Sequence, residues 1–180
     1  MANQKSEDWS KSALAAKQAL DRPLPGVKHL VDTGTKIVLN AQSGKPWCPK
    51  EGKTFCNFAV DAGASEYGFM GFHDASRKPL MANEIINVMA AKGSGWVLST
   101  AQDAYHAALR GDLAVATYSE APHGHVAIVA PGGRVWSQKW NNYAPPVFNV
   151  GKTVADKAPW TMGANFAFMY QPNYYVFVGV

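Results

Sequence analysis

The sequence predicts an α+β fold, in which helices from the first half of the chain pack against an antiparallel sheet formed by the second half. Three observations support this prediction. Apolar residues recur at helical spacing up to Gly111, short β-branched and aromatic runs dominate from Leu113 onward, and a turn signal at residues 131–133 separates two of those runs. Because the chain has 180 residues and 47% hydrophobic content, we expect a single domain over residues 1–180.

The helical segments occupy the N-terminal half of the chain. Apolar spacing and end signals predict helices over residues 8–20, 27–40, 56–64, 82–92 and 99–111. Pro23 ends the first helix, because the residue before a proline disfavours the helical conformation. Residues 42–54 are rich in Gly, Pro and Lys and form an exposed loop, so the third helix begins at or near Cys56. Residues 1–45 are therefore expected to form a helical N-terminal part.

The strand signals all follow Gly111. β-branched and aromatic runs predict strands over residues 113–118, 125–130, 134–140, 166–170 and 174–178. A tight turn at Gly132-Gly133 would join the second and third of these strands as a hairpin. In that hairpin, His125 would pair with Trp140.

Cys56 is the sharpest candidate for a nucleophile. Its position where a loop enters a helix favours the thiolate, because the helix dipole and the free N–H groups of the first turn stabilise negative charge. The alternatives are a buried structural thiol or a disulfide with Cys48, since the chain has 2 cysteines. We expect Cys48, which lies in the Lys-rich loop, to take no part in the chemistry.

His125 opens a predicted strand, and the start of a strand is a rigid platform for a base. A cysteine at a helix start that faces a histidine on a strand is the arrangement of papain-like hydrolases. His123 lies two residues away and raises the alternative of a metal site. Two ligands are too few, however, and no acidic or cysteine partner has a recognisable spacing, so we expect no metal and no cofactor.

Three segments resemble the NlpC/CHAP superfamily of cell-wall peptidases and amidases. They are residues 54–60 (TFCNFAV), 82–85 (ANEI) and 124–132 (GHVAIVAPG). The resemblance extends over residues 53–141, which we expect to be the catalytic core. It implies that Cys56 is the nucleophile, that His125 is the base, and that a third polar residue on the following strand orients the imidazole.

The predicted hairpin indicates which residue is the third. Directly paired residues share a face of a sheet, so Gln138 would lie diagonally beside His125, within reach of a hydrogen bond, while Ser137 would point to the other face. A change of one residue in the turn would select Ser137 instead, and Asn141 is a further alternative. We expect Gln138 to complete the catalytic group.

Two further residues are expected to contact the substrate. Asn57 directly follows the nucleophile, and Trp140 is set opposite His125 by the predicted hairpin. The resemblance implies that the substrate is a peptide stem or cross-link of bacterial peptidoglycan, cleaved at an amide bond by acyl transfer.

The net charge of +4 excludes few partners by itself. The 17 Lys and Arg are scattered rather than gathered in a stripe, which argues against nucleic acid and fits either an anionic wall polymer or simple solubility. No stretch reaches the roughly 20 apolar residues of a membrane span, and residues 1–20 lack the apolar core of a signal peptide. We therefore expect synthesis in a bacterial or phage-infected cytoplasm and export or release to the cell wall. An immunity protein is expected as a partner if the chain is an antibacterial toxin.

Two rival functions belong to other classes. A binding module of the same fold would hold wall peptide without cutting it and would have no use for a reactive thiol of low pKa. A cysteine protease or acyltransferase acting on protein or lipid would keep the same cysteine and histidine and differ in its substrate.

Overall fold

The computed structural model describes residues 24–51, 53–156 and 160–179. The described helices are α2 (Pro25–Asn40), α3 (Cys56–Glu66), α4 (Ala82–Ala90), α5 (Ala101–Arg110) and α6 (Ala164–Ala167). The strands are β1 (Trp96–Ser99), β2 (Ala114–Tyr118), β3 (His125–Val129), β4 (Val135–Ser137), β5 (Asn142–Ala144), β6 (Pro146–Phe148), β7 (Met162–Gly163) and β8 (Asn173–Phe177). The predicted α+β class is confirmed. The helix predicted over residues 8–20 lies outside the described residues.

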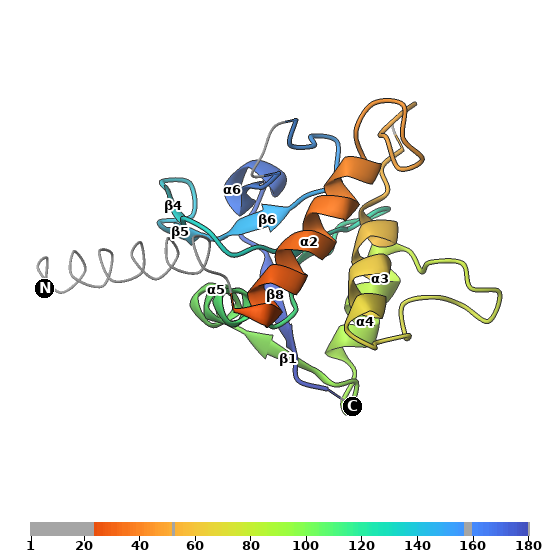
Figure 1. Cartoon of the computed structure of the whole chain (residues 1–180), viewed down its shortest axis with the longest axis horizontal. Coiled ribbons are helices and arrows are strands. Elements are labelled where there is room, and N and C mark those ends of the chain that lie inside the picture. Colours follow the sequence, from red (N-terminus) through yellow and green to blue (C-terminus); the bar gives the residue numbers. More distant parts are fainter. Residues whose placement is uncertain (1–23, 52, 157–159, 180) are drawn as a thin grey trace, which may run out of the picture.

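The sheet is six-stranded and antiparallel, in the order β1-β8-β2-β3-β6-β7. Strands β4 and β5 form a separate two-stranded ribbon. Helices α2 and α3 lie side by side, and both contact the sheet, α2 at β6 and α3 at β3 (Figure 1). No helix of the described residues is both long and apolar enough to cross a lipid bilayer.

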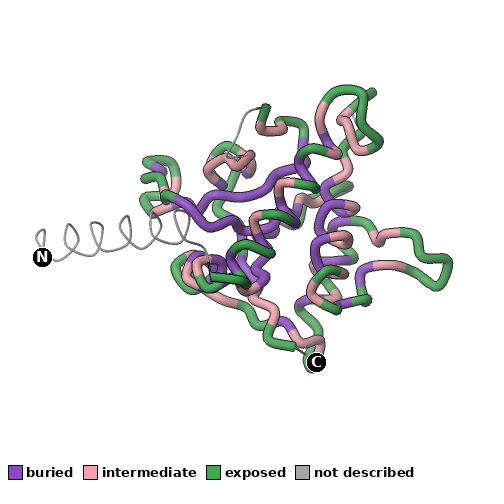
Figure 2. Tube along the Cα trace, in the orientation of Figure 1, coloured by how far each residue is buried: buried purple, intermediate pink, exposed green. Residues whose placement is uncertain are grey.

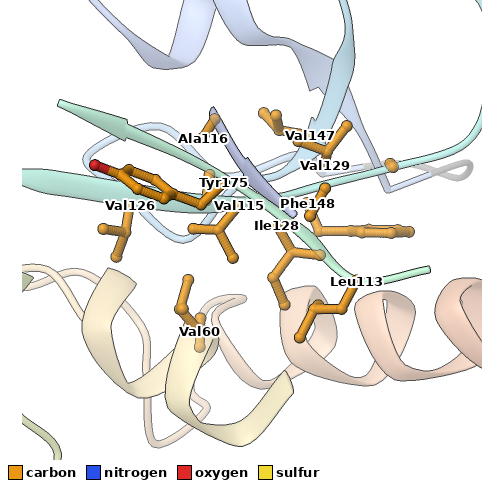
Figure 3. Packing of buried hydrophobic residues seen from close by; sticks show 14 of the residues in the cluster. Val60, Leu113, Val115, Ala116, Val126, Ile128, Val129, Val147, Phe148 and Tyr175 are labelled. Atoms are coloured by element: carbon orange, nitrogen blue, oxygen red, sulfur yellow. The ribbon is translucent and has the colours of Figure 1, made fainter. Parts of the chain in front are cut away.

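Helix α3 packs closely on β3 because small and apolar side chains meet at their contact. On one side of the sheet, Val126 and Ile128 point toward the helices and Val60, whereas Val129 lies on the other side, as the alternation of a strand requires (Figure 3). A Cβ added at Gly63 would lie 2.2 Å from the Ile128 side chain. The glycine therefore admits Ile128 into the surface of α3 and fixes the height of the helix above the strand.

Burial follows the sheet strands and the inward faces of α2 and α3, while the connecting loops are mostly exposed (Figure 2). The end signals of α5 act as the sequence predicts. The Thr100 hydroxyl accepts a hydrogen bond from the Asp103 backbone N–H, and Gly111 ends the helix in the left-handed conformation at φ 88°. Helices near residues 27–40, 56–64, 82–92 and 99–111 are confirmed, as are strands near residues 113–118, 125–130 and 174–178.

The predicted hairpin between β3 and the following strand is wrong. Strand β3 pairs with β6, with Ile128 opposite Phe148, and β4 pairs with β5 instead. Burial explains the choice of partner. Phe148 of β6 is 2% exposed, whereas Trp136 of β4 remains 47% exposed. The edge of β3 is therefore filled by the strand that removes more apolar surface from water.

The strand predicted over residues 166–170 is also wrong. Residues 164–167 form the short helix α6, and Phe168 follows it in an extended conformation. A short apolar run fits a buried helix as well as a strand, and here Phe168 is buried while Phe166 is 73% exposed. The consequence for the site is that Phe168 packs inward, toward β3.

Candidate active site

Cys56 is the first residue of α3, as its place after the loop of residues 42–54 predicts. It is only 5% exposed, and it packs with the core of the domain. The residue before the helix, Phe55, provides no side-chain cap. The first-turn N–H groups of a helix have no partner within the helix, so they remain available to a negative charge at this end.

Burial and hydrogen bonding shift the pKa of Cys56 in opposite directions. Burial alone raises the pKa of the thiol, but the hydrogen bond and charge of His125, the backbone of Val126 and the side chain of Thr54 together lower the pKa below its ordinary value. Burial alone likewise lowers the pKa of His125, whereas the hydrogen bond and charge of Cys56 and a hydrogen bond to Asn149 raise that pKa above its ordinary value. Both directions favour a thiolate beside an imidazolium.

Asn149 fixes the imidazole of His125. The His125 Nε2 lies 2.7 Å from the Asn149 Oδ1, and the Asn149 Nδ2 donates a 2.7 Å hydrogen bond to the carbonyl of Thr153. Because the amide nitrogen is directed to Thr153, the oxygen faces the ring and must accept, so Nε2 carries the hydrogen. This arrangement leaves Nδ1 for the Cys56 sulfur.

The strand pairing explains why Asn149 reaches the ring. The register of β3 with β6, continued past the strand ends, brings Gly151 opposite His125. A Cβ added at Gly151 would lie 2.9 Å from the His125 Cε1, so only glycine leaves room for the ring in this position. On another side the ring meets Phe168, with ring centroids 4.8 Å apart and planes inclined by 50°. The imidazole is thus held by a hydrogen bond and by packing.

Helix α4 anchors the loop that leads into His125. The Asn83 Nδ2 donates to the carbonyl of Glu120 at 3.0 Å, and the Ser119 hydroxyl donates to the Asn83 Oδ1 at 3.3 Å. A Cβ added at Gly124 would lie 2.2 Å from that same Oδ1. Asn83 and Gly124 therefore fit together and fix the chain immediately before His125.

The structure does not bring Gln138 to His125. Gln138 is exposed in the turn after β4, and Asn149 occupies the ring nitrogen that it was expected to reach. The two alternatives fare no better. The Ser137 hydroxyl accepts a hydrogen bond from the Trp140 backbone N–H, and Asn141 is exposed in the same turn. All three assignments depended on the hairpin that does not form.

The two expected substrate contacts also have other surroundings. Asn57 is 7% exposed, and its Nδ2 donates a 2.9 Å hydrogen bond to the carbonyl of Leu80, so it ties α3 to the chain entering α4. Trp140 lies half-buried in the turn before β5 and is not paired with His125. The reason is again that β6, not the segment with Trp140, takes the edge of β3.

Sequence reasoning missed Asn149, which lies beyond the segment of residues 53–141. A signal for it existed. Residues 146–150 form a short apolar run that Asn149 interrupts, and Gly151 follows directly. A single polar residue inside an apolar run is expected to be buried with a hydrogen-bond partner, and Asn149 is 2% exposed.

A cavity of about 380 Å³ adjoins the Cys56 end of α3. It lies between the loop that follows α2 and the loop that follows β6, and its lining residues are Pro49, Lys50, Glu51, Lys53, Thr54 and Lys152. Thr54 connects the cavity with the thiol, because its side chain hydrogen bonds Cys56. The described residues contain no group of three or more His, Cys, Asp and Glu side chains placed to hold a metal ion.

The two cysteines differ in their surroundings. Both are free thiols, but Cys48 is half-buried and its Sγ lies 3.7 Å from the carbonyl of Pro49, which makes a weak contact. Cys56 alone has an imidazole partner among the described contacts. A thiolate at a helix N-terminus can attack a carbonyl carbon. An imidazolium held in place by an amide can then protonate the leaving group.

A comparison with protein-family models finds no match for this chain, and a comparison with curated protein sequences finds none either.

Proposed function

We propose that the protein is a cysteine hydrolase that cleaves amide bonds in bacterial peptidoglycan peptides, with Cys56 as nucleophile, His125 as acid and base, and Asn149 as the residue that orients the imidazole. The observation that carries the proposal is the contact of Cys56 with His125 and of His125 with Asn149. Opposite pKa shifts in Cys56 and His125 favour a thiolate and an imidazolium, and the same histidine is held at 2.7 Å by a buried asparagine. Such a group has a use in acyl transfer.

In the first half of the reaction, the Cys56 thiolate attacks the carbonyl carbon of the amide and a tetrahedral intermediate forms. The first-turn N–H groups of α3, which begins at Cys56, are the donors proposed for its oxyanion. The intermediate collapses as the carbon–nitrogen bond breaks, and the His125 imidazolium gives its proton to the leaving amine. The products are a free amine, a thioester on Cys56 and a neutral imidazole.

In the second half, water attacks the thioester. Neutral His125 removes a proton from the water, and the carbon–sulfur bond breaks to release a carboxylic acid and restore the thiolate beside the imidazolium. Asn149 serves both halves, because its oxygen accepts from Nε2 and keeps Nδ1 directed at the sulfur. No cofactor enters either half.

The finer fold assignment and the substrate class belong to the same proposal. We propose a papain-like arrangement of the NlpC/CHAP type, supported by a nucleophile at the start of α3, a histidine at the start of β3 and the packing of α3 on β3. The resemblance of residues 54–60 and 124–132 to that superfamily supports peptidoglycan peptide as the substrate.

The direct test is digestion of purified peptidoglycan by the reduced parent protein, by Cys56→Ala and by the matched control Cys48→Ala. We expect the parent and Cys48→Ala to release fragments whose masses show hydrolysis of one amide, and Cys56→Ala to release none. All samples are kept reduced so that oxidation of a thiol cannot imitate loss of the nucleophile. Digestion by Cys56→Ala at the parent rate would show that another residue is the nucleophile.

The same experiment separates the rivals. If the parent binds peptidoglycan without cutting it and its Cys56 titrates as an ordinary thiol, the binding module replaces the enzyme. If the parent leaves peptidoglycan intact but hydrolyses or acylates protein or lipid substrates through Cys56, the chemistry stands and the substrate class changes.

A further inference from the structure

The cavity beside Cys56 has a positive lining. Lys50, Lys53 and Lys152 line it together with a single carboxylate, Glu51. Among the residues that the structure describes, none of these three lysines forms a salt bridge. Since like charges in a shared hollow repel one another, an anion bound among them would relieve that repulsion and gain charge-assisted hydrogen bonds.

The backbone brings two of these lysines together. The Lys50 N–H donates to the Lys53 carbonyl at 3.2 Å, and the Lys53 N–H donates to the Lys50 carbonyl at 2.9 Å. Residues that exchange both bonds of an antiparallel pair present their side chains on one face. The turn therefore holds two ammonium groups on the same side, although a like-charged pair in this position is unfavourable.

Residues that line the cavity lie next to both Cys56 and His125. Thr54 lines it and hydrogen bonds Cys56. Lys152, which also lines it, directly follows Gly151, the residue whose backbone lies against the His125 ring. A peptide whose carbonyl carbon lies at the Cys56 sulfur would therefore place a neighbouring substituent in this cavity.

We propose that the cavity is a subsite for a carboxylate that the substrate carries next to the scissile amide. This inference rests on the function proposed above and adds a selectivity to it: the enzyme prefers an amide flanked by a free acid over the same amide flanked by a carboxamide. A phosphate of a wall polymer has the same charge, but the peptide's own carboxylate is favoured, because a peptide held at Cys56 already has it within reach.

The test compares two soluble peptidoglycan stem peptides, one with free carboxylates and one in which the carboxylates are converted to carboxamides. Binding of each peptide is measured by calorimetry to full-length Cys56→Ala protein, which cannot turn the peptide over. The same protein then receives Lys50→Gln, Lys53→Gln and Lys152→Gln, singly and all three together. Lys45→Gln is the matched control, because Lys45 lies in the same loop but does not line the cavity.

We expect the acid peptide to bind about tenfold more tightly than its amide, the range of a charged hydrogen bond. The preference should weaken with salt and fall in each single variant. The ratio of the two affinities should approach one in the triple variant and persist in Lys45→Gln. Equal affinity of the parent background for the two peptides, or a preference that survives in the triple variant, would overturn the subsite.

Hydrolysis of the two peptides by the protein with Cys56 intact keeps this proposal separate from the proposed function. Cleavage that is indifferent to the carboxylate would overturn the subsite and leave the hydrolase standing. Absence of cleavage of either peptide would count against the proposed peptidoglycan hydrolase, while the calorimetric preference and its loss on substitution of the lysines would still support a carboxylate site.

Discussion

Two histidines contact side chains of helix α3, and only one of them belongs to a group that can perform chemistry. At the start of the helix, His125 joins Cys56 to Asn149. One and a half turns later, the His73 Nδ1 lies 3.2 Å from the Asp61 carboxylate, and both side chains are about equally hidden, at 17% and 16% exposed. Among the described contacts no thiol or hydroxyl bonds either side chain of this pair, because the Ser65 hydroxyl donates only to the backbone carbonyl of Asp61.

A polar partner for the imidazole is therefore not enough to make a catalytic group. His73 also forms an antiparallel bridge with Pro79, so its contacts tie the loop between α3 and α4 back to the helix. His125, by contrast, lies between the Cys56 thiol and the Asn149 amide, at the end of α3 where free N–H groups stabilise negative charge. Substitution by alanine should therefore lower activity at His125 and stability at His73.

The largest expected effect is on activity at the start of the helix. His125→Ala should lower kcat/KM for peptidoglycan hydrolysis by about 10³-fold, because the thiolate loses the group that stabilises it and the leaving amine loses its acid. The rate of fragment release measures this loss. In a linked group, the double variant Cys56→Ala/His125→Ala should be hardly slower than either single variant. Losses that multiply in the double variant would mean that the two residues act independently.

A smaller loss is expected where the imidazole is only oriented. Asn149→Ala should lower kcat by about 10- to 100-fold with little change in KM, because the ring keeps its contacts with Phe168 but loses the bond that fixes its Nδ1 toward the sulfur. Gln138→Ala is the matched control and should remain within about twofold of the parent, since its side chain is exposed. Equal losses in the two variants would contradict the assignment of the orienting role to Asn149 rather than Gln138.

The pH dependence of thiol alkylation tests the ion pair between Cys56 and His125. In the background Cys48→Ala, Cys56 is the only thiol of the chain. Its lowered pKa keeps it ionised below the ordinary thiol value of about 8.5, and the raised pKa of His125 keeps the imidazole charged into the same range.

At pH 6.5, alkylation by iodoacetamide should therefore be about tenfold faster than in Cys48→Ala/His125→Ala, allowing for the weaker nucleophilicity of a low-pKa thiolate. The advantage should shrink as the pH rises, because the ordinary thiol then ionises too. Hydrolysis should show a maximum between the two pKa values, falling on the acid side as the thiolate is protonated and on the alkaline side as the imidazolium is lost. Identical alkylation rates with and without His125 would contradict the ion pair.

The placement of Cys56 and His125 was predictable from the sequence because its signals are local. The loop of residues 42–54 gives way to helical spacing at Cys56, and the β-branched run after His125 reads directly as a strand. The helix ends at Thr100 and Gly111 were predictable for the same reason, since caps depend on a few neighbouring residues.

The third residue was not predictable in this way, because it depends on which strand fills the edge of β3. A Gly-Gly turn favours the next strand along the chain, but the choice is decided by burial, which hides Phe148 and leaves Trp136 on the surface. Once β6 is the partner, Asn149 and Gly151 reach His125 and Gln138 cannot. The wrong strand partner for β3 thus led to the wrong partner for His125.

The smallest expected effect on activity is at the other histidine, where the effect falls on stability. His73→Ala removes the partly buried contact with Asp61 and should lower the free energy of unfolding by about 1–2 kcal/mol, where the ranges for an ordinary hydrogen bond and for one to a charged group meet. Urea unfolding measures the change. An unaltered slope of the unfolding free energy against urea concentration would show that the variant still buries the same surface. Hydrolysis by the folded variant should stay within about twofold of the parent, because α3 is held against β3 by Val60, Gly63 and Ile128. A loss of activity comparable to that of His125→Ala, with stability unchanged, would mean that the Asp61 pair acts on the reaction and that the contrast between the two histidines is wrong.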